Sequence, residues 1–348
     1  QGLNYALGPG QDVNQGATID QIIDPNLSWE TTEELDIGLE FGFLDNRLSG
    51  EIDYYNRLNR DAILPVELPD AFGAAGTTLT PAGKVRNKGV EVALSWSDTV
   101  GEDFYYSIGG NITFNTNELE EVTNPFFAEN EGGSIGNGQI TKKVVEGEPL
   151  GSFWLLEVTG VDEAGNFSYE DLNNDGEIDN NDRQFFGSYQ PKTFFGVNVS
   201  LSYRNWDVNL DGFGNYGNVV YNGKKAQRFG GENIEQSVAD NRWIPENPSD
   251  TEPAPNNNVP VSSTYYLESG DFFRLNNITL GYTIPQGENA LFNRFRIYAT
   301  AQNPFISQKF SGFTPELPGD GNPLNNPGIE LSVYPSVQSY ILGINVSF

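Results

Sequence analysis

The sequence contains no cysteine, no histidine and no methionine. Disulfide bridges, thiol nucleophiles, histidine-based catalytic triads and the usual zinc sites are therefore excluded. Long apolar runs are missing as well: none exceeds Phe153–Leu156, whereas a transmembrane helix needs roughly 18 or more apolar residues. No signal peptide is visible and the first residue is Gln1, so we expect the chain to be a piece of a longer polypeptide.

Basic residues are scarce, with 19 Lys and Arg against 48 Asp and Glu and a formal charge of −29. This balance disfavours nucleic acid as a partner, because most of that affinity comes from neutralising phosphates. It favours solvated acidic loops and hard cations such as calcium. Glu118, Glu120 and Glu121 could be drawn as a glycosidase pair, but chance proximity explains them better in so acidic a chain. No phosphate-binding or dinucleotide motif is present, and we do not expect an enzyme.

Alternation of apolar and polar residues is the strongest signal in the sequence. Between residues 35 and 43, every odd position is Leu, Ile or Phe, and every even position is Asp, Glu or Gly. Successive side chains of a strand point to opposite faces, so this pattern predicts a strand with one apolar face. Similar alternation recurs in nine segments, at 35–43, 48–54, 89–96, 104–115, 195–203, 206–211, 277–284, 295–302 and 340–348.

The connections between these segments are of two kinds. Short ones, near Asp45, at 97–103, near Asn205 and at 285–293, alternate with long ones at 57–86, 118–192, 216–270 and 303–336. A soluble sandwich also alternates, but it has no reason to place all its long loops at one end. Short turns at one end and long loops at the other are typical of outer-membrane barrels, whose strands need roughly 9–11 residues. We therefore predict an all-β, transmembrane antiparallel β-barrel with long extracellular loops.

Strand parity gives an orientation and a count. If the short turns are periplasmic, the last strand runs downward and Phe348 lies in the periplasm. Segments 148–158 and 166–169 could add two crossings, so we expect about nine to eleven strands. An odd or incomplete set cannot close a barrel of the usual even number, and an open edge in lipid leaves backbone groups unsatisfied. Earlier strands N-terminal to Gln1 are therefore expected.

Aromatic residues gather near the ends of the predicted strands. We interpret them as the girdles at the two membrane–water interfaces rather than as sugar-stacking platforms. The girdle residues are Tyr54, Tyr55, Trp96, Phe104, Tyr105, Tyr106, Phe194, Phe195, Trp206, Phe272 and Phe273. Aromatic residues of the loops are better candidates for contact with a ligand, namely Phe126, Phe127, Trp154, Phe185 and Trp243.

Residues 171–182 match a calcium-binding loop of the EF-hand type. The expected oxygen donors are Asp171, Asn173, Asp175, Asp179 and Asp182, with Glu177 contributing its backbone carbonyl. Gly176 fits the sharp turn and Ile178 can anchor the loop, whereas Asp182 replaces the usual bidentate Glu, as in dockerin loops. The alternative is an acidic surface turn. We predict a structural calcium ion here, in an extracellular loop, with no catalytic role.

Several short sequence segments, spread in order along nearly the whole chain, resemble the C-terminal part of the barrel of SusC/RagA-type, TonB-dependent outer-membrane proteins. They occur at 25–32, 36–42, 46–50, 53–55, 87–91, 149–153, 171–183, 273–282, 301–303 and 340–348. The resemblance implies that residues 1–348 are the C-terminal part of a barrel of about 22 strands. It further implies an N-terminal plug with a TonB box, a SusD-like surface lipoprotein as partner, and TonB-driven import of oligosaccharides or oligopeptides.

Three functions remain open at this point. The preferred one is nutrient import across the outer membrane of a Gram-negative cell, with lipid around the barrel. The second is a scaffolding barrel subunit of an outer-membrane complex, which a TonB box upstream of Gln1 would argue against. The third is a soluble, calcium-stabilised adhesin, which would be extracted without detergent.

Overall fold

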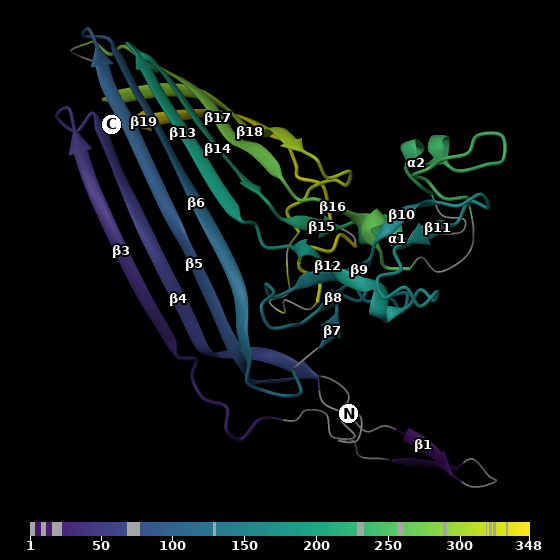
Figure 1. Cartoon of the computed structure of the whole chain (residues 1–348). Coiled ribbons are helices and arrows are strands. Elements are labelled where there is room, and N and C mark those ends of the chain that lie inside the picture. The colour runs from purple at the N-terminus through teal and green to yellow at the C-terminus, as the bar shows by residue number, and fades with distance from the viewer. Residues whose placement is uncertain are drawn as a thin grey trace.

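In the computed structural model, the described residues are 4–7, 12–15, 23–67, 77–127, 130–227, 233–255, 261–287, 291–317, 319, 322, 325–331 and 333–348. One antiparallel sheet of nine strands dominates the fold (Figure 1). Its strands are β3 (Thr32–Phe43), β4 (Leu48–Glu67), β5 (Thr77–Val100), β6 (Phe104–Val122), β13 (Thr193–Tyr203), β14 (Trp206–Tyr216), β17 (Phe272–Ile284), β18 (Arg294–Gln308) and β19 (Ser339–Ser347). They neighbour one another in chain order, from β3 at one edge to β19 at the other, as the alternation predicted.

The strand register gives the sheet two chemically different faces. Residues directly opposite each other on paired strands share a face. On the outer face, Leu39 pairs with Ile52, which pairs with Val92. These apolar residues are not covered by the chain, and Leu39 is 63% exposed. An exposed, continuous apolar face of this kind matches the lipid-facing surface of a membrane barrel.

Aromatic residues divide between the two faces. At the short-turn end, Trp206 packs against Tyr282 with ring centroids 4.7 Å apart on the outer face, as expected for an interfacial girdle. Four of the girdle residues lie on the opposite face, because their register partners there are Gly89, Ser202, Thr113 and Asn215; they are Tyr55, Tyr105, Phe194 and Phe272. The assignment of these four residues to the girdle was therefore wrong.

Three strands extend far past the length of a membrane crossing. β4, β5 and β6 contain 20, 24 and 19 residues, against the roughly 9–11 that span a bilayer. The pairing register shifts near Ala62 and Val85. Beyond these shifts, the ends of the three strands pack around a hydrophobic core. The buried residues of this core are Ala62, Leu64, Val66, Ala82, Val85, Leu119, Phe127, Val144 and Leu150.

The described parts of the connections after β6 and β14 fold into a compact body, the loop-side body, at the end of the sheet opposite the short turns (Figure 1). It contains a four-stranded sheet of β7 (Glu131–Gly132), β8 (Lys142–Lys143), β9 (Ser152–Leu156) and β12 (Arg183–Ser188). Two two-stranded sheets complete its strands, one of β10 (Val158–Val161) with β11 (Phe167–Tyr169) and one of β15 (Val219–Tyr221) with β16 (Leu267–Ser269). A second core forms here from Ile135, Phe153, Leu155, Tyr221, Ala226, Tyr266 and Ile329.

Segments 148–158 and 166–169 belong to this loop-side body, so they add no crossing. The apolar run that suggested a crossing strand, Phe153–Leu156, is buried among loop residues in β9 instead. The sheet therefore has nine strands, the lower limit of the expected nine to eleven. A separate hairpin, β1 (Asn4–Leu7) with β2 (Asp12–Gln15), precedes β3.

Helices are short, namely α1 (Gly223–Gln227), α2 (Gln236–Asn241) and 3-10 turns at Asn180–Asp182 and Thr264–Tyr266. In the described part of the chain, none of them has the length and apolar composition needed to cross a membrane.

Candidate functional site

The inner face of the nine-stranded sheet is polar and acidic. It carries Asp36, Glu40, Glu51, Asp53, Glu91, Asp207 and Asp211, which alternate with the outward apolar residues. A shallow groove of about 830 Å³ runs over this wall. Glycines such as Gly109 and Gly196 expose the backbone at its floor, and Glu40 and Glu51 line it. The wall is therefore suited to polar or cationic material.

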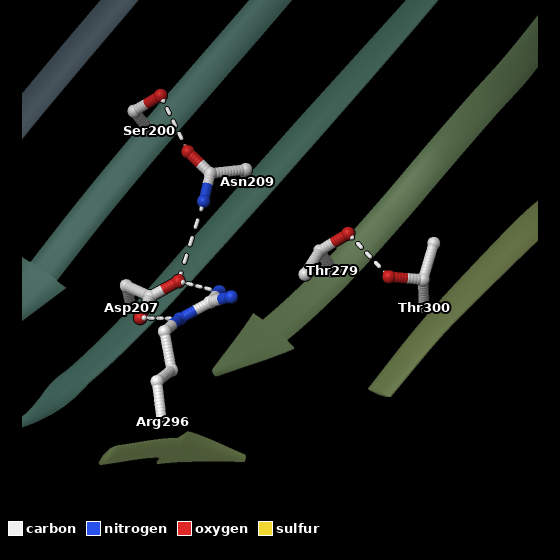
Figure 2. A network of polar contacts seen from close by, with 6 residues as sticks. All are labelled: Ser200, Asp207, Asn209, Thr279, Arg296 and Thr300. Carbon is white, nitrogen blue, oxygen red and sulfur yellow. Dashed lines mark hydrogen bonds and ion pairs between the residues drawn. The ribbon is translucent and has the colours of Figure 1, made fainter. Parts of the chain in front are cut away.

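Figure 2 shows how polar side chains cross from strand to strand on this face. Arg296 of β18 donates to both carboxylate oxygens of Asp207 on β14, at 2.9 Å from Nε and 2.5 Å from Nη2. β17 lies between these two strands, and the guanidinium passes over its Gly281. A Cβ at Gly281 would lie 2.3 Å from Arg296 Nη2, so a larger residue there would displace the guanidinium from its present position.

The same network continues upward along the wall. Asn209 donates to Asp207 (3.4 Å) and accepts from the Ser200 hydroxyl (2.9 Å). Beside it, the Thr279 and Thr300 hydroxyls are 2.8 Å apart (Figure 2). Hydrogen bonds between neighbouring strands satisfy these polar groups and fix the positions of the side chains.

Residues 171–182, the predicted calcium loop, lie between β11 and β12 in the loop-side body. Several of the expected donors accept backbone N–H groups of the loop. Asp171 Oδ2 accepts from Gly176 (3.0 Å), and Asp175 Oδ1 accepts from Glu177 (2.8 Å). Gly176 has φ +86° with open space around its Cβ position, as the sharp turn requires. Backbone N–H groups of the loop thus point toward the Asp171 and Asp175 carboxylates.

The other end of the loop is fastened by Asp182. This side chain is buried and accepts from the N–H groups of Leu172 (3.0 Å) and Asp179 (2.8 Å). Asn173 Nδ2 donates to Asp175 Oδ2 at 2.8 Å. Ile178 is 44% exposed, so its predicted role as an apolar anchor is wrong.

The oxygen donors of this loop do not all converge on one point. Within the described residues, no group of three or more acidic, His or Cys side chains is arranged to hold a metal ion. However, Asp171 Oδ1 is buried and has no hydrogen-bond partner there. The amide of Asn173 and the backbone carbonyl of Glu177 are oxygen donors of the kind that calcium accepts beside carboxylates. The residues present fit a calcium ion if the carboxylates close around it.

A second cavity, of about 630 Å³, lies where β14 and β17 meet the connection between β18 and β19. Arg274 and Glu316 pair in its wall at 2.5 Å, although they are 42 residues apart. Asn215 and Asn218 line the same cavity. We did not predict these residues, because nothing in the sequence links a strand arginine to a loop glutamate so far away.

The family model described as TonB dependent receptor-like, beta-barrel matches residues 2–303. The chain belongs to this family. TonB-dependent receptor P3 of Formosa agariphila is 30% identical over 99% of the chain, and the match covers 36% of that relative. TonB-dependent receptor SusC of Bacteroides thetaiotaomicron is 27% identical over 99% of the chain and 34% of its own length. The chain therefore spans about a third of the length of these relatives.

A solved structure of the RagAB peptide transporter has the same fold. Its TM-score is 0.80 with 24% identity, and the match covers all of this chain and 38% of that one. The expected resemblance to SusC and RagA is confirmed, and so is the barrel fold. Barrels of this family belong to the outer membrane, and their proteins are receptors rather than enzymes.

Two of the five loop aromatics of the receptor chain are buried and cannot meet a ligand. Phe127 is fully buried in the core at the end of β4, β5 and β6. Trp154 is also buried, between the cations of Lys143 (4.6 Å from Nζ to the ring centroid) and Arg183 (5.2 Å from Cζ). Phe126 is 48% exposed, and its contact with a ligand stays a prediction. Spacing along the sequence does not separate Phe126 from its buried neighbour.

Tyrosines in the loop-side body stay protonated. Burial raises the pKa of Tyr169 to about 12, and it also raises the pKa of Tyr221 and Tyr266. Burial likewise lowers the pKa of the Lys225 ammonium, whose Nζ is 3.7 Å from the Tyr265 ring centroid. The rings of Tyr221, Tyr265 and Tyr266 pack against one another in this body.

Proposed function

We propose that this chain is part of the wall of an importer that carries a nutrient, an oligosaccharide or an oligopeptide, across the outer membrane. The observation that carries the proposal is membership of the TonB-dependent receptor family together with a sheet that is apolar outside and acidic inside. An apolar face left in water would favour aggregation, which argues against the soluble adhesin. The polar wall would line the path of a hydrated cargo.

The energy source and the partner are part of the same proposal. TonB would act through the N-terminal part of the protein, and a SusD-like lipoprotein would meet the long loops. The similarity to SusC and to a RagAB peptide transporter supports this assembly. The short turns and Phe348 would then be periplasmic and the loop-side body extracellular.

Uptake of labelled oligosaccharides and oligopeptides by cells that express the full-length protein tests the import function. We expect accumulation to fall at least tenfold in cells that lack TonB. If cells that express the receptor accumulate no more of any tested cargo than cells that lack it, import is refuted and the scaffolding role is favoured. Surface labelling of the extracellular loops controls for correct assembly in both strains.

We further propose that residues 171–182 bind a calcium ion that stiffens this loop. Support comes from the buried, unpartnered Asp171 Oδ1 and from the wrapped backbone around Gly176. The ion would bring the Asp171, Asp175 and Asp179 carboxylates together and offset their repulsion. Because the ligand binds only the folded loop, it stabilises the loop by mass action.

Calcium at a hundredfold excess over its Kd is expected to stabilise the loop by about 2.7 kcal/mol. Proteolysis of the loop in the full-length protein, with calcium or with EDTA, measures this effect. Asp171→Asn combined with Asp175→Asn should remove the protection. Glu177→Ala is the matched control, because its side chain is not a proposed ligand, and it should keep the protection. Equal cleavage of the unmodified protein with calcium and with EDTA would refute the site.

A further inference from the structure

The first residue after the 171–182 loop, Arg183, joins three segments that are far apart in the sequence. Its Nε donates to Asn180 Oδ1 in the loop at 3.0 Å. Its Nη1 donates to the backbone oxygen of Trp154 on β9 at 3.2 Å and to the hydroxyl of Ser262 at 2.9 Å. Ser262 belongs to the connection between β14 and β17. One side chain therefore links the loop to β9 and to a second long connection.

The guanidinium group of Arg183 makes these contacts as one rigid unit. Its Cζ lies 5.2 Å from the centroid of the Trp154 ring, and its backbone pairs with Leu156 where β12 meets β9. A guanidinium is planar and carries its N–H donors in a fixed fork, so a shift at one hydrogen bond moves the others. A displacement of Asn180 would therefore disturb the contact with Ser262.

Residues 262–264, the docking segment, meet β9 and β10 through a small number of contacts. The N–H of Leu156 donates to the backbone oxygen of Ser262 at 3.4 Å, and the N–H of Val158 donates to the hydroxyl of Thr264 at 2.9 Å. Leu156 forms a single parallel bridge to the segment rather than a longer ladder. The two serines of the segment are nevertheless fully buried. Short, sparsely bonded segments open locally at a low cost in free energy, so the contact of Arg183 can control this docking.

Two of the proposed calcium ligands lie on either side of Asn180. The carboxylate of Asp179 caps the 3-10 turn that begins at Asn180, and the carboxylate of Asp182 accepts from the N–H of Asp179 at 2.8 Å. The N–H of Arg183 closes the turn on the backbone oxygen of Asn180. A calcium ion bound by both carboxylates would hold both ends of the turn, and with them the amide that faces the guanidinium.

We propose that calcium binding to residues 171–182 controls the docking of residues 262–264, and that Arg183 transmits the effect. The assignment rests on the calcium site proposed above and gives the ion a regulatory role. With the ion bound, Asn180 orients the guanidinium and the docking segment stays in place. Without the ion, the guanidinium loses a fixed anchor and the segment opens more often. Calcium outside the cell would thus keep two of the long connections joined.

Hydrogen exchange of the full-length receptor in detergent, with saturating calcium or with EDTA, tests the coupling. In the unmodified protein, calcium should slow exchange within the loop and, about fivefold, at Leu156 and Val158, whose N–H groups donate to the docking segment. Asn180→Ala should keep the protection of the loop, because Asn180 is exposed and is not a proposed ligand. It should reduce the effect at Leu156 and Val158 to less than about twofold. Asn205→Ala, in the short turn between β13 and β14, makes the same substitution elsewhere and should keep both effects.

Arg183→Lys keeps the positive charge but replaces the fork with a single ammonium, which cannot hold all three acceptors at once. Exchange at Leu156 and Val158 should then be fast with calcium and with EDTA alike. Calcium affinity, measured by isothermal titration, should fall about fivefold, because the coupling between two sites is reciprocal. A purely structural role of Arg183 at the junction would leave that affinity unchanged.

The outcomes separate the coupling from the calcium site. Protection of the loop by calcium without any change at Leu156 and Val158 in the unmodified protein would overturn the coupling and leave the calcium site standing. An undiminished effect at these two amides in Asn180→Ala would overturn the role of Arg183, and this variant decides the question if Arg183→Lys does not assemble. Equal exchange with calcium and with EDTA throughout the chain would overturn both proposals.

Discussion

Val199→Arg is expected to destabilise the barrel in a lipid bilayer by about 2–4 kcal/mol, the cost of a midplane arginine on a lipid-facing strand. Val199 lies in the middle of β13 and pairs with Ile108 on β6 and Leu210 on β14. All three belong to the outer apolar face. A guanidinium at this point loses its hydration and finds no carboxylate among these neighbours.

Ser200→Arg is the matched control, one residue along the same strand and on the opposite face. Ser200 faces the polar wall, where the arginine would meet Asn209 and the acidic groups beyond it (Figure 2). The loss of the Ser200–Asn209 hydrogen bond should cost about 1 kcal/mol. Guanidinium unfolding of the full-length protein in lipid vesicles, followed by tryptophan fluorescence, measures both values. Equal costs at the two positions would mean that the apolar face does not contact lipid.

The crossing strands could be predicted because their pattern is local and periodic. Each residue of β3 or β13 alternates between lipid and the inner wall, and the sequence repeats that alternation. Short turns such as 44–47 and 204–205 leave adjacent strands only one way to pair, as neighbouring antiparallel strands. The order of the sheet therefore follows directly from the order of the segments.

The loop-side body could not be predicted in the same way. Its strands β9 to β12 are short, and β9 is buried along its whole length, so they show no clear period. A short apolar run such as Phe153–Leu156 is compatible with either a crossing strand or a loop core. Register shifts in β4 and β5 also change which residues are covered, and no sequence feature marks them.

Contacts between segments far apart in the sequence could not be predicted for a related reason. Arg296 reaches over Gly281 to Asp207, and this contact is visible only once the strand order is known. The Arg274–Glu316 pair likewise depends on a loop folding back onto β17. In contrast, the turn at Gly176 in the 171–182 loop was predicted, because every residue it needs lies within one short stretch.

Phe127→Ala is expected to destabilise the long ends of β4, β5 and β6 by about 3–5 kcal/mol. Phe127 is fully buried, and it belongs to the same core as Val66, Leu119 and Val144. Deleting its ring removes apolar contact area and leaves a cavity that strands fixed at both ends cannot collapse. The expected result is faster hydrogen exchange in residues 61–66 and 119–122 of the full-length protein.

Phe126→Ala is its matched control, since Phe126 is 48% exposed. This substitution should change the free energy of unfolding by less than about 0.5 kcal/mol. If Phe126 meets a ligand, this variant should instead weaken binding while hydrogen exchange stays unchanged. The two substitutions thus separate a core role from a surface role at adjacent positions of identical chemistry. Similar exchange rates in both variants would show that the extended strand ends do not depend on this core. The loops would then depend on the contacts around Phe153 and Tyr221.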